Sequence, residues 1–253
     1  MYAAERQQAI LTQARLEGRV EVAALAELLD VTPETIRRDL TALERHGLLR
    51  RLHGGAVPVE RLGFELGVAD REGRLVAEKE RIAKRAVQEL PDDGAIILDA
   101  GTTTMRLAEA LPTDRDLTVV TNSLPIAQLL VSRPSMTVHL AGGRIRGRTM
   151  AAVDDWAVTA LRGIFADVAF IGANGISPSR GLTTPDRAEA AVKAAMIAAA
   201  RRTVVLADHT KVGADHFARF GDLSEVDLVI TDSGLDPELA HELEVAGPEV
   251  VRA

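Results

Sequence analysis

Residue types that suit the binding of a polar small molecule gather after six short apolar runs in the C-terminal two thirds of the chain. The runs cover residues 95–98, 117–120, 137–140, 168–171, 203–206 and 228–230. Glycines, hydroxyl side chains, carboxylates and a lysine follow them, in the stretches 99–104, 121–123, 141–144, 172–175, 208–211 and 231–232. Because the carboxyl ends of parallel strands meet at one edge of a sheet, this pattern predicts a polar ligand site.

The stretch Gly101-Thr102-Thr103-Thr104 is suited to hold a phosphate group. Glycine lets the backbone approach the ligand, a helix that starts here supplies free N–H groups and positive potential, and the threonine hydroxyls donate further hydrogen bonds. An ordinary helix start with threonine caps has the same sequence, so both interpretations stand. The sequence has neither a Walker motif nor Gly-x-Gly-x-x-Gly at a helix start, which leaves nucleotide binding with little support.

A lysine follows the fifth apolar run. Lys211, three residues after Asp208, pairs with a phosphate or hydroxyl of the ligand, or else it is a surface lysine in a loop. Lys193 fits better as a solvated or structural charge. The six histidines show no metal-ligand spacing, and the neighbours His209 and His216 are weak metal candidates. We expect no metal and no other cofactor.

A second group of candidate residues lies near the N-terminus, where three short helical patterns follow one another. The first covers about residues 4–16, and the second covers about residues 22–29, with Leu25, Leu28 and Leu29 as its apolar face. The third begins at Thr32-Pro33-Glu34, a helix start with a threonine cap, and ends at His46-Gly47. Its Ile36, Leu40 and Leu43 share one face. The opposite face carries arginines and threonines, which suits a recognition helix in the major groove of DNA.

Residues 48–56 predict a β-wing after this helix. Gly54 and Gly55 permit a tight turn, and Arg50 and Arg51 are placed to meet DNA phosphates. Residues 37–51 hold five arginines against two acids. The alternative is a helical bundle with a solvated basic face. The candidate DNA-binding residues are Thr32, Glu34, Thr35, Arg37, Arg38, Thr41, Arg45, Arg50, Arg51 and His53.

The elements that position these residues form two domains. Residues 1–57 predict a winged helix-turn-helix domain. Residues 58–74 contain a proline, three glycines and mixed charge, which is typical of a connector. Residues 75–253 begin with a helix over about 76–90 and then alternate buried strands with helices, which predicts a mostly parallel α/β domain. The expected fold class is therefore α/β with an N-terminal winged helix-turn-helix.

Composition limits the alternatives. Hydrophobic residues make up 47% and charged residues 26%, the balance of an ordinary globular protein. The absence of cysteine excludes disulfides, thiolate catalysis and Cys-based zinc sites. No apolar run approaches the length of a membrane span and the N-terminus does not resemble a signal peptide, so we expect a cytoplasmic protein with no membrane partner. The net charge of −7 argues against a basic coat for non-specific nucleic-acid binding.

The N-terminal motifs resemble those of the DeoR family of bacterial repressors. They are Val31-Thr32-Pro33-Glu34-Thr35-Ile36-Arg37-Arg38-Asp39-Leu40, Leu43-Glu44-x-x-Gly47 and His53-Gly54-Gly55-Ala56. The family usually has serine where Thr32 stands, and both residues cap a helix. The resemblance implies that the chain binds operator double-stranded DNA.

The resemblance continues through the second domain and so spans nearly the whole chain. It rests on Glu78-Lys79-x-x-Ile82-Ala83, Asp99-x-Gly101-Thr102-Thr103-Thr104, Val120-Thr121-Asn122-Ser123, Gly142-Gly143, Asp167-x-Ala169-Phe170-Ile171-Gly172-Ala173, Gly181-Leu182-Thr183-Thr184 and Asp208-x-x-Lys211. The family's sensor domain is similar in fold to ribose-5-phosphate isomerase and CoA transferases, and its effectors are phosphorylated sugars or polyols, such as fructose 1-phosphate. The resemblance implies that Asp99, Gly101 to Thr104, Asn122, Gly143 and Lys211 line the effector pocket. The family commonly has a glycine about where Asp154 stands. Within residues 144–156, we therefore expect the acid to alter either the start of the following helix or the local environment of the ligand.

The full set of candidate effector residues combines the strand ends with the resemblance. It comprises Asp99, Gly101, Thr102, Thr103, Thr104, Thr121, Asn122, Gly142, Gly143, Asp208 and Lys211. Trp156, the single tryptophan, is expected to serve packing.

Two functions fit these residues. The first is a DNA-binding regulator, expected to repress a carbohydrate-utilisation operon and to be controlled by a small phosphorylated metabolite. It would act as a homodimer or homotetramer, because such DNA heads read paired half-sites. The second is a sugar-phosphate isomerase-like enzyme with a fused DNA-binding head, in which Asp99, Asp208 and Lys211 would serve the chemistry. The head favours the regulator, since an isomerase has no use for it, so we expect no enzyme.

Overall fold

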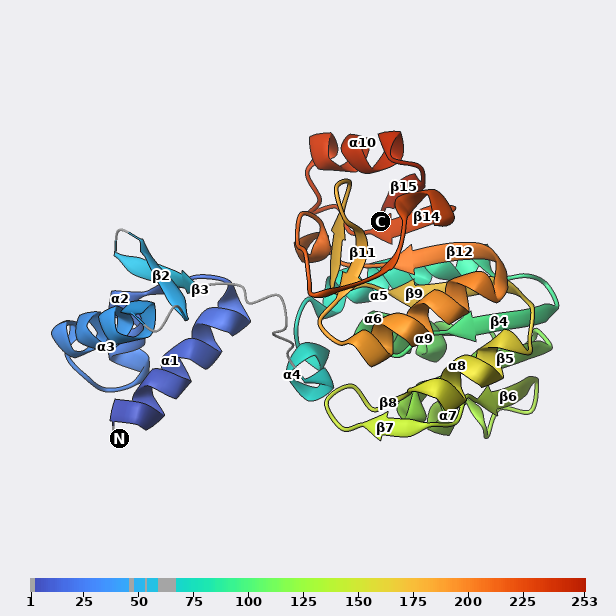
Figure 1. Ribbon diagram of the computed structural model, residues 1–253, viewed down its shortest axis with the longest axis horizontal. Coiled ribbons are helices and arrows are strands. Elements are labelled where there is room, and N and C mark those ends of the chain that lie inside the picture. The colour runs from blue at the N-terminus through green and yellow to red at the C-terminus, as the bar shows by residue number, and fades with distance from the viewer. Residues whose placement is uncertain (1–2, 46–47, 53, 59–66) are drawn as a thin grey trace. The chain divides into compact units, whose positions relative to one another are not determined.

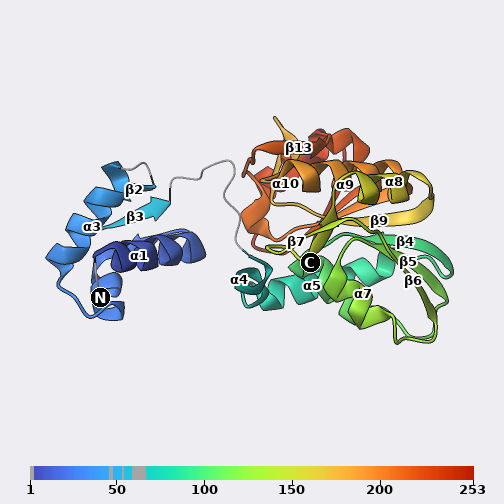
Figure 2. The same cartoon turned by 60° about the horizontal axis from the view of Figure 1, so that its bottom comes forward.

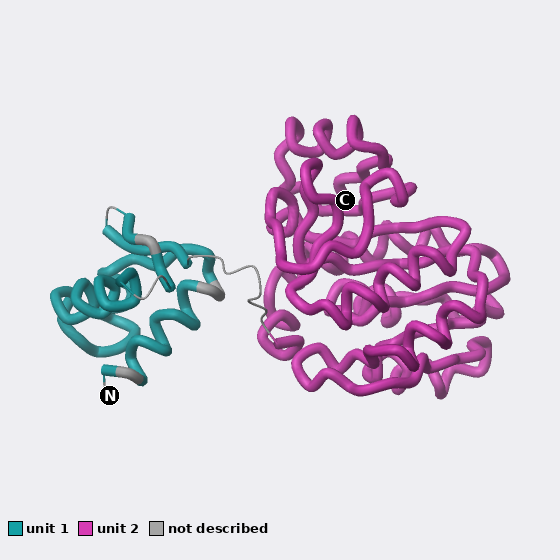
Figure 3. The backbone as a smooth tube through the Cα atoms, in the orientation of Figure 1, with its two compact units in different colours: residues 1–61 teal, residues 62–253 magenta. Residues whose placement is uncertain are grey.

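The computed structural model describes residues 3–45, 48–52, 54–58 and 67–253. The chain forms two compact units, residues 1–61 and residues 62–253 (Figure 3). The predicted connector, residues 58–74, is not all connector: Val68–Glu72 forms a short helix, α4, within the second unit.

The first unit contains three helices and a small antiparallel sheet (Figure 1). The helices are α1 (Ala3–Glu17), α2 (Val22–Leu28) and α3 (Pro33–Arg45), and the strands are β1 (Val20–Glu21), β2 (Leu49–Leu52) and β3 (Gly55–Pro58), in the order β1-β3-β2. The hairpin of β2 and β3 is the predicted wing. The Thr32 hydroxyl accepts a hydrogen bond from the Thr35 amide at 3.3 Å, as the predicted cap requires. The expected helix end at His46-Gly47 lies outside the described residues.

The apolar core of this unit lies between the helices and the sheet. Ile10, Leu25, Ile36, Leu40 and Leu49 are fully buried in it. One expectation was wrong: Leu28 is 61% exposed. The buried stripe of α2 runs through Val22, Leu25 and Ala26, and at helical spacing Leu28 falls to one side of it.

Asp39 joins α1 to α3. It is buried, and its carboxylate pairs with the guanidinium of Arg6 at 2.5 Å and accepts a hydrogen bond from the side-chain amide of Gln7 at 3.0 Å. A buried charge is retained where it is paired and hydrogen-bonded. These contacts therefore fix the orientation of α3 relative to α1.

The second unit is a seven-stranded sheet in which every pair of neighbouring strands is parallel. The order is β15-β14-β12-β9-β4-β5-β6. The strands are β4 (Gly94–Leu98), β5 (Leu117–Thr121), β6 (Met136–Leu140), β9 (Ala166–Gly172), β12 (Ala200–Leu206), β14 (Leu228–Thr231) and β15 (Glu249–Arg252). The six predicted runs are strands of this sheet, and β15 was not predicted. The run at residues 137–140 was wrongly expected to be buried on both faces, because β6 lies at an edge and is largely exposed.

Helices cover both faces of this sheet (Figure 2). On one face pack α5 (Val76–Ala86), α6 (Thr102–Ala110) and α7 (Leu124–Leu130), and on the other pack α8 (Asp155–Arg162), α9 (Arg187–Ala198) and α10 (Pro237–Val245). Successive strand residues serve opposite faces: Ile96 and Leu98 join the α5–α7 side, and Ile97 joins the α8–α10 side. The architecture is therefore a three-layer α/β fold, as predicted.

Shorter strands and turns complete the second unit. A hairpin of β7 (Arg144–Arg146) and β8 (Ala151–Val153) follows β6. A small antiparallel sheet contains β10 (Gly175–Ser177), β11 (Gly181–Thr184) and β13 (Ala218–Gly221). Short 3-10 turns occur at Val87–Glu89, His209–Lys211 and Leu223–Glu225. Among the described residues, no helix is long and apolar enough to cross a membrane.

The start of α8 differs from the expected packing. Trp156 was expected to be packed and is instead 79% exposed, because the buried side of α8 is formed by Ala157 and Leu161. Asp154, just before α8, has φ 75° and ψ −172°, a backbone region that only glycine adopts readily. Its carboxylate pairs with Arg144 at 2.7 Å.

Replacing Asp154 by glycine is expected to raise the free energy of unfolding by about 1 kcal/mol, because relief of roughly 1–3 kcal/mol of backbone strain outweighs the loss of an exposed ion pair worth about 0–1 kcal/mol. Urea unfolding followed by circular dichroism measures the change. Asp154→Ala is the matched control, since it removes the ion pair and keeps the strain. Equal stability of the glycine and alanine variants would contradict the prediction.

Candidate ligand pocket and nucleic-acid interface

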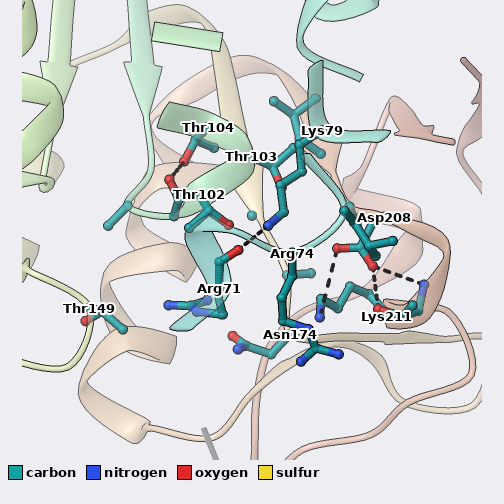
Figure 4. A pocket seen from close by; sticks show the side chains of 18 of the residues that line it. Arg71, Arg74, Lys79, Thr102, Thr103, Thr104, Thr149, Asn174, Asp208 and Lys211 are labelled. Carbon is teal, nitrogen blue, oxygen red and sulfur yellow. Dashed lines mark hydrogen bonds and ion pairs between the residues drawn. The ribbon is translucent and has the colours of Figure 1, made fainter. Parts of the chain in front are cut away.

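A pocket opens at the carboxyl ends of β4, β9 and β12 (Figure 4). The strand order reverses between β4 and β9: β4 leads on to β5 and β6, whereas β9 leads to β12, β14 and β15 on the other side. Ligands of open α/β sheets bind at such a reversal. The pocket is lined by Arg71, Arg74, Leu75, Lys79, Ala100, Gly101, Thr102, Thr103, Thr104, Thr149, Gly172, Ala173, Asn174, Glu189, Lys193, Leu206, Ala207, Asp208, Thr210 and Lys211.

The start of α6 forms one wall of this pocket. Gly101 precedes the helix and has no side chain. The first-turn residues Thr102 to Thr104 line the pocket, and the helix start has no side-chain cap. The Thr104 hydroxyl donates to the Gly101 carbonyl at 3.1 Å. Free amides at a helix N-terminus attract an anion. The structure thus places the four residues of the Gly101–Thr104 stretch at the pocket, as the sequence predicted.

Most of the positive charge at the pocket comes from α4, α5, α9 and the residues next to α4, which the pattern of strand ends did not predict; Lys211 is the cation that it did predict. Arg71 lies on α4, Arg74 just after it, Lys79 on α5 and Lys193 on α9. Together with Lys211, five cations line the pocket against the carboxylates of Glu189 and Asp208 among the described residues.

Lys79 is the most unusual of these cations. Its side chain is buried, and its ammonium donates to the Arg71 carbonyl at 2.5 Å. Burial lowers the pKa of Lys79 to about 8, while the nearby Asp208 carboxylate acts in the opposite direction. Figure 4 shows the Lys79 side chain between Thr102 to Thr104 on one side and Asp208 with Lys211 on the other. At neutral pH the pocket therefore holds a mostly charged, poorly solvated ammonium.

Asp99 lies directly behind the lining and not in it. The carboxylate is 1% exposed, accepts from the Gly172 amide at 2.9 Å, and forms an ion pair with Lys193. Lys193 also donates to the Gly172 carbonyl at 2.8 Å and lies 5.4 Å from the centre of the Phe220 ring. Burial raises the pKa of Asp99, and the Lys193 charge acts against this rise. Lys193 was expected to be a solvated or a structural charge. It is 5% exposed and joins the ends of β4 and β9, so it is the structural charge and not the solvated one.

Besides Asp99, four predicted effector residues are not among the lining residues. They are Thr121, Asn122, Gly142 and Gly143. The β7–β8 hairpin covers this strand end, since the Ala152 amide donates to the Asn122 carbonyl at 2.7 Å. The Asn122 side chain accepts from the Ala100 amide at 3.0 Å, so it supports the pocket loop from behind.

The backbone of the β7–β8 hairpin explains why residue 143 is a glycine. The φ of Gly143 is +134°, and a Cβ atom there would stand 2.4 Å from the Val153 carbonyl oxygen. The glycine is therefore required for the close approach of the hairpin strands. No such requirement is visible for Gly142, where a Cβ would meet nothing within 4 Å.

The turn after β12 brings Asp208 and Lys211 to the pocket, as predicted. The Asp208 carboxylate accepts from the amide and the hydroxyl of Thr210 and lies 4.0 Å from the Lys211 ammonium. The next strand end does not reach the pocket, because Asp232 is occupied by the backbone and ring of His209, at 2.8 Å each. Three of the six strand ends thus meet there. No cluster that could hold a metal occurs among the residues the structure describes.

The exposed face of α3 forms a shallow hollow with the wing. Glu34, Arg37, Arg38, Thr41, Ala42, Arg45 and Arg51 line it. Arg37 pairs with Glu34 at 3.2 Å, and the Arg51 guanidinium donates to the Thr41 hydroxyl at 3.0 Å. Arg38 and Arg45 are exposed and have no hydrogen bond or ion pair with another described residue.

The remaining candidates for DNA contact are placed as follows. The hydroxyls of Thr32 and Thr35 lie 2.9 Å apart at the start of α3, and both residues lie outside the hollow. The Arg50 side chain and His53 lie outside the described part of the chain. Six of the predicted residues therefore share one surface, and its arginines outnumber its carboxylate by four to one.

Comparison with known proteins gives matches over both units. Residues 6–61 match the DeoR-like helix-turn-helix domain, and residues 75–233 match the DeoR C terminal sensor domain. The chain is 39% identical to the HTH-type transcriptional regulator GlpR of Haloferax volcanii, over 99% of this chain and 98% of the relative. It is 31% identical to the glycerol-3-phosphate regulon repressor of Escherichia coli, over 90% of each chain.

Among solved structures, part of the chain is similar to ribose 5-phosphate isomerase A of Methanocaldococcus jannaschii. The identity is 19%, the match covers 53% of each chain, and the TM-score is 0.40. A likeness at this level carries no information on activity.

Proposed function

The chain belongs to the DeoR family of transcriptional regulators, and we propose that it represses a carbohydrate-utilisation operon under the control of a phosphorylated sugar or polyol. The first unit binds operator DNA, and the pocket of the second unit binds the effector. We place its action in the cytoplasm, where the operator is found.

The charge of the pocket supports a phosphorylated effector. Five cations against two carboxylates, together with the free amides at the start of α6, leave an excess of positive charge around the space. A phosphate monoester is nearly dianionic at neutral pH and offers three acceptor oxygens. It therefore matches both the charge and the donors of the pocket, which an uncharged sugar does not.

The arginines of α3 support the assignment of DNA binding to this surface. A recognition helix presents the side chains of one face to base edges, and a wing adds phosphate contacts. Arg38 and Arg45 are available for base or phosphate contacts, and Arg51 of β2 lies beside them. Because heads of this kind read paired half-sites, we propose a homodimer or homotetramer.

The isomerase-like alternative is not favoured. A general base must reach the substrate proton, and the Asp99 carboxylate is held behind the pocket by Lys193 and the Gly172 amide. The named relatives are transcriptional regulators. We expect no turnover of ribose 5-phosphate or related esters. Turnover that is lost in Asp99→Ala would reverse this preference.

A thermal-shift screen tests the proposed effector class. Sugar and polyol phosphates are compared with their unphosphorylated parents, since a ligand that binds the native state raises the melting temperature by mass action. We expect a shift with at least one ester and none with its parent. The matched variant Lys211→Ala is expected to weaken that shift. No shift with any ester would remove phosphorylated metabolites from consideration.

The affinity for the effector is expected to depend on pH through Lys79. Its pKa is about 8, so the charged form that attracts phosphate is lost as the pH rises through this value. The phosphate group loses its second charge below about pH 6. Affinity is therefore expected to be highest between these limits and to fall between pH 7 and 9, as titration calorimetry would show. Lys79→Met should remove this fall, and a constant affinity in the unmodified protein from pH 7 to 9 would contradict the prediction.

A further inference from the structure

Helix α4 lies near the start of the second unit and contributes Arg71 to the lining of the pocket. Nine residues, 59–67, separate it from the last strand of the first unit. None of its residues is buried. Its attachments include the Val68 amide, which donates to the Arg148 carbonyl at 2.8 Å, and the Arg71 carbonyl, which accepts from Lys79. An element whose side chains are not buried opens at a lower free-energy cost than the core does.

The backbone on either side of this attachment is also strained. Leu75, between α4 and α5, has φ 48°, and Met150, in the turn that carries Arg148, has φ 56°. Non-glycine residues adopt this region only where surrounding contacts impose it. The docked position of α4 therefore depends on the contacts that it makes at the pocket.

Four cations converge where α4 meets the pocket. Lys79, Lys211, Arg71 and Arg74 all line the same pocket. After burial, the charges of the other three also lower the pKa of Lys79. Asp208 is the nearby carboxylate that acts in the opposite direction. A dianion bound among them relieves this repulsion, and two of the cations that it binds belong to the α4 segment.

We propose that residues 67–75 are part of the effector site: Arg71 and Arg74 bind the anionic group that the start of α6 binds from the other side. An occupied pocket then holds α4 on the second unit, and an empty pocket releases it. This inference rests on the proposed function, because it assumes an anionic effector in the same pocket. Release frees residues 67–75 from the pocket, so the effector acts on the segment of the second unit that follows the DNA head in the sequence.

Hydrogen–deuterium exchange of the full chain tests the proposal, with inorganic phosphate and sn-glycerol 3-phosphate as probes. The amides of Val68, Arg71 and Arg74 all donate within or from this segment. Their exchange is expected to slow as the probe saturates, by up to about 100-fold at a concentration 100 times Kd. A peptide covering residues 101–106 reports pocket occupancy, and one covering residues 237–245 is the remote control.

Single variants test what the guanidinium groups of Arg71 and Arg74 contribute to probe binding and leave the backbone contact of Arg71 intact. Arg71→Ala keeps the carbonyl that Lys79 contacts, and both Arg71→Ala and Arg74→Ala are expected to weaken probe binding about tenfold, as for the loss of a charged hydrogen bond. Arg81→Ala is the matched control, because Arg81 is an exposed cation of α5 and does not line the pocket. It is expected to change binding less than about twofold.

The outcomes distinguish this inference from the proposed function. Slower exchange in residues 101–106 without any change in residues 67–75 would overturn the role of α4 and leave the effector site in place. Unchanged probe affinity in both arginine variants would do the same. If neither segment responds to either probe or to any other ester, the effector site and the role of α4 both fall.

Discussion

Lys193→Met is expected to lower the free energy of unfolding by about 3–5 kcal/mol, the usual cost of removing one partner from a buried ion pair. Lys193 and Asp99 are both almost fully buried, and the pair joins the ends of β4 and β9. In the variant, the Gly172 amide remains as a donor to the Asp99 carboxylate. Denaturation of the full chain by urea, followed by far-ultraviolet circular dichroism, measures the loss.

The pH dependence of this loss identifies its cause. Without Lys193, the folded-state pKa of Asp99 rises further above its unfolded value, because burial already raises it. Such a group stabilises the fold at low pH and loses this contribution as the pH rises through the folded pKa. The loss in free energy of unfolding caused by Lys193→Met is therefore expected to be smallest in mild acid and largest near neutral pH. Adding Asp99→Asn should recover part of it, and a deficit that does not vary with pH would show another cause.

A matched lysine controls for the loss of charge alone. Lys84 is an exposed residue of α5, and Lys84→Met is expected to change the free energy of unfolding by less than about 0.5 kcal/mol. A similar loss in the two variants would contradict the importance of the buried pair.

Arg38→Ala is expected to cost roughly 1–3 kcal/mol of specific operator binding, or about 5- to 150-fold in Kd. Arg38 is exposed near the middle of α3, in the hollow that faces away from the core. An arginine in this position can pair with guanine through two hydrogen bonds. The operator is first selected from random-sequence duplexes, and Kd is then measured on it and on a scrambled duplex.

Comparison of the two duplexes tells base contacts from phosphate contacts. A loss confined to the selected operator shows base reading, and an equal loss on both shows that Arg38 contacts phosphate. Arg19→Ala is the matched control, since Arg19 is an exposed cation of the same unit, outside the hollow, and pairs with Glu21. Unchanged operator binding in Arg38→Ala would remove this residue from the interface.

Much of the fold follows from the sequence, because buried parallel strands and capped helices have strong local patterns. The six apolar runs and the Thr32 cap are examples. The strand β15 was missed, since Glu249 to Arg252 contain charges at both ends and resemble a surface segment. The short strands of the β7–β8 hairpin were missed because their pairing depends on contacts with each other and not on composition.

The pocket was predicted only in part, for a geometric reason. Strand ends reveal residues such as Thr102 and Asp208, whereas Arg71, Lys79 and Lys193 reach the pocket from helices distant in sequence. One signal was available: Lys79 lies on the same helical stripe as Ile82, Ala83 and Ala86, so a charge stands on a buried face. Lys193 likewise lies on the buried stripe of α9, with Met196 and Ile197. A charge on a buried stripe indicates either a partner or a ligand.

The exposed position of Trp156 determines which changes of the protein alter its tryptophan fluorescence. As the single tryptophan, it is the source of nearly all indole emission, and its ring already faces water in the folded chain. Unfolding therefore shifts the emission maximum little, and ligand binding in the pocket, which Trp156 does not line, leaves it unchanged. Burial of the ring by a second chain would shift the emission to the blue. The same residue that is a poor probe of folding is thus a specific probe of contact at α8.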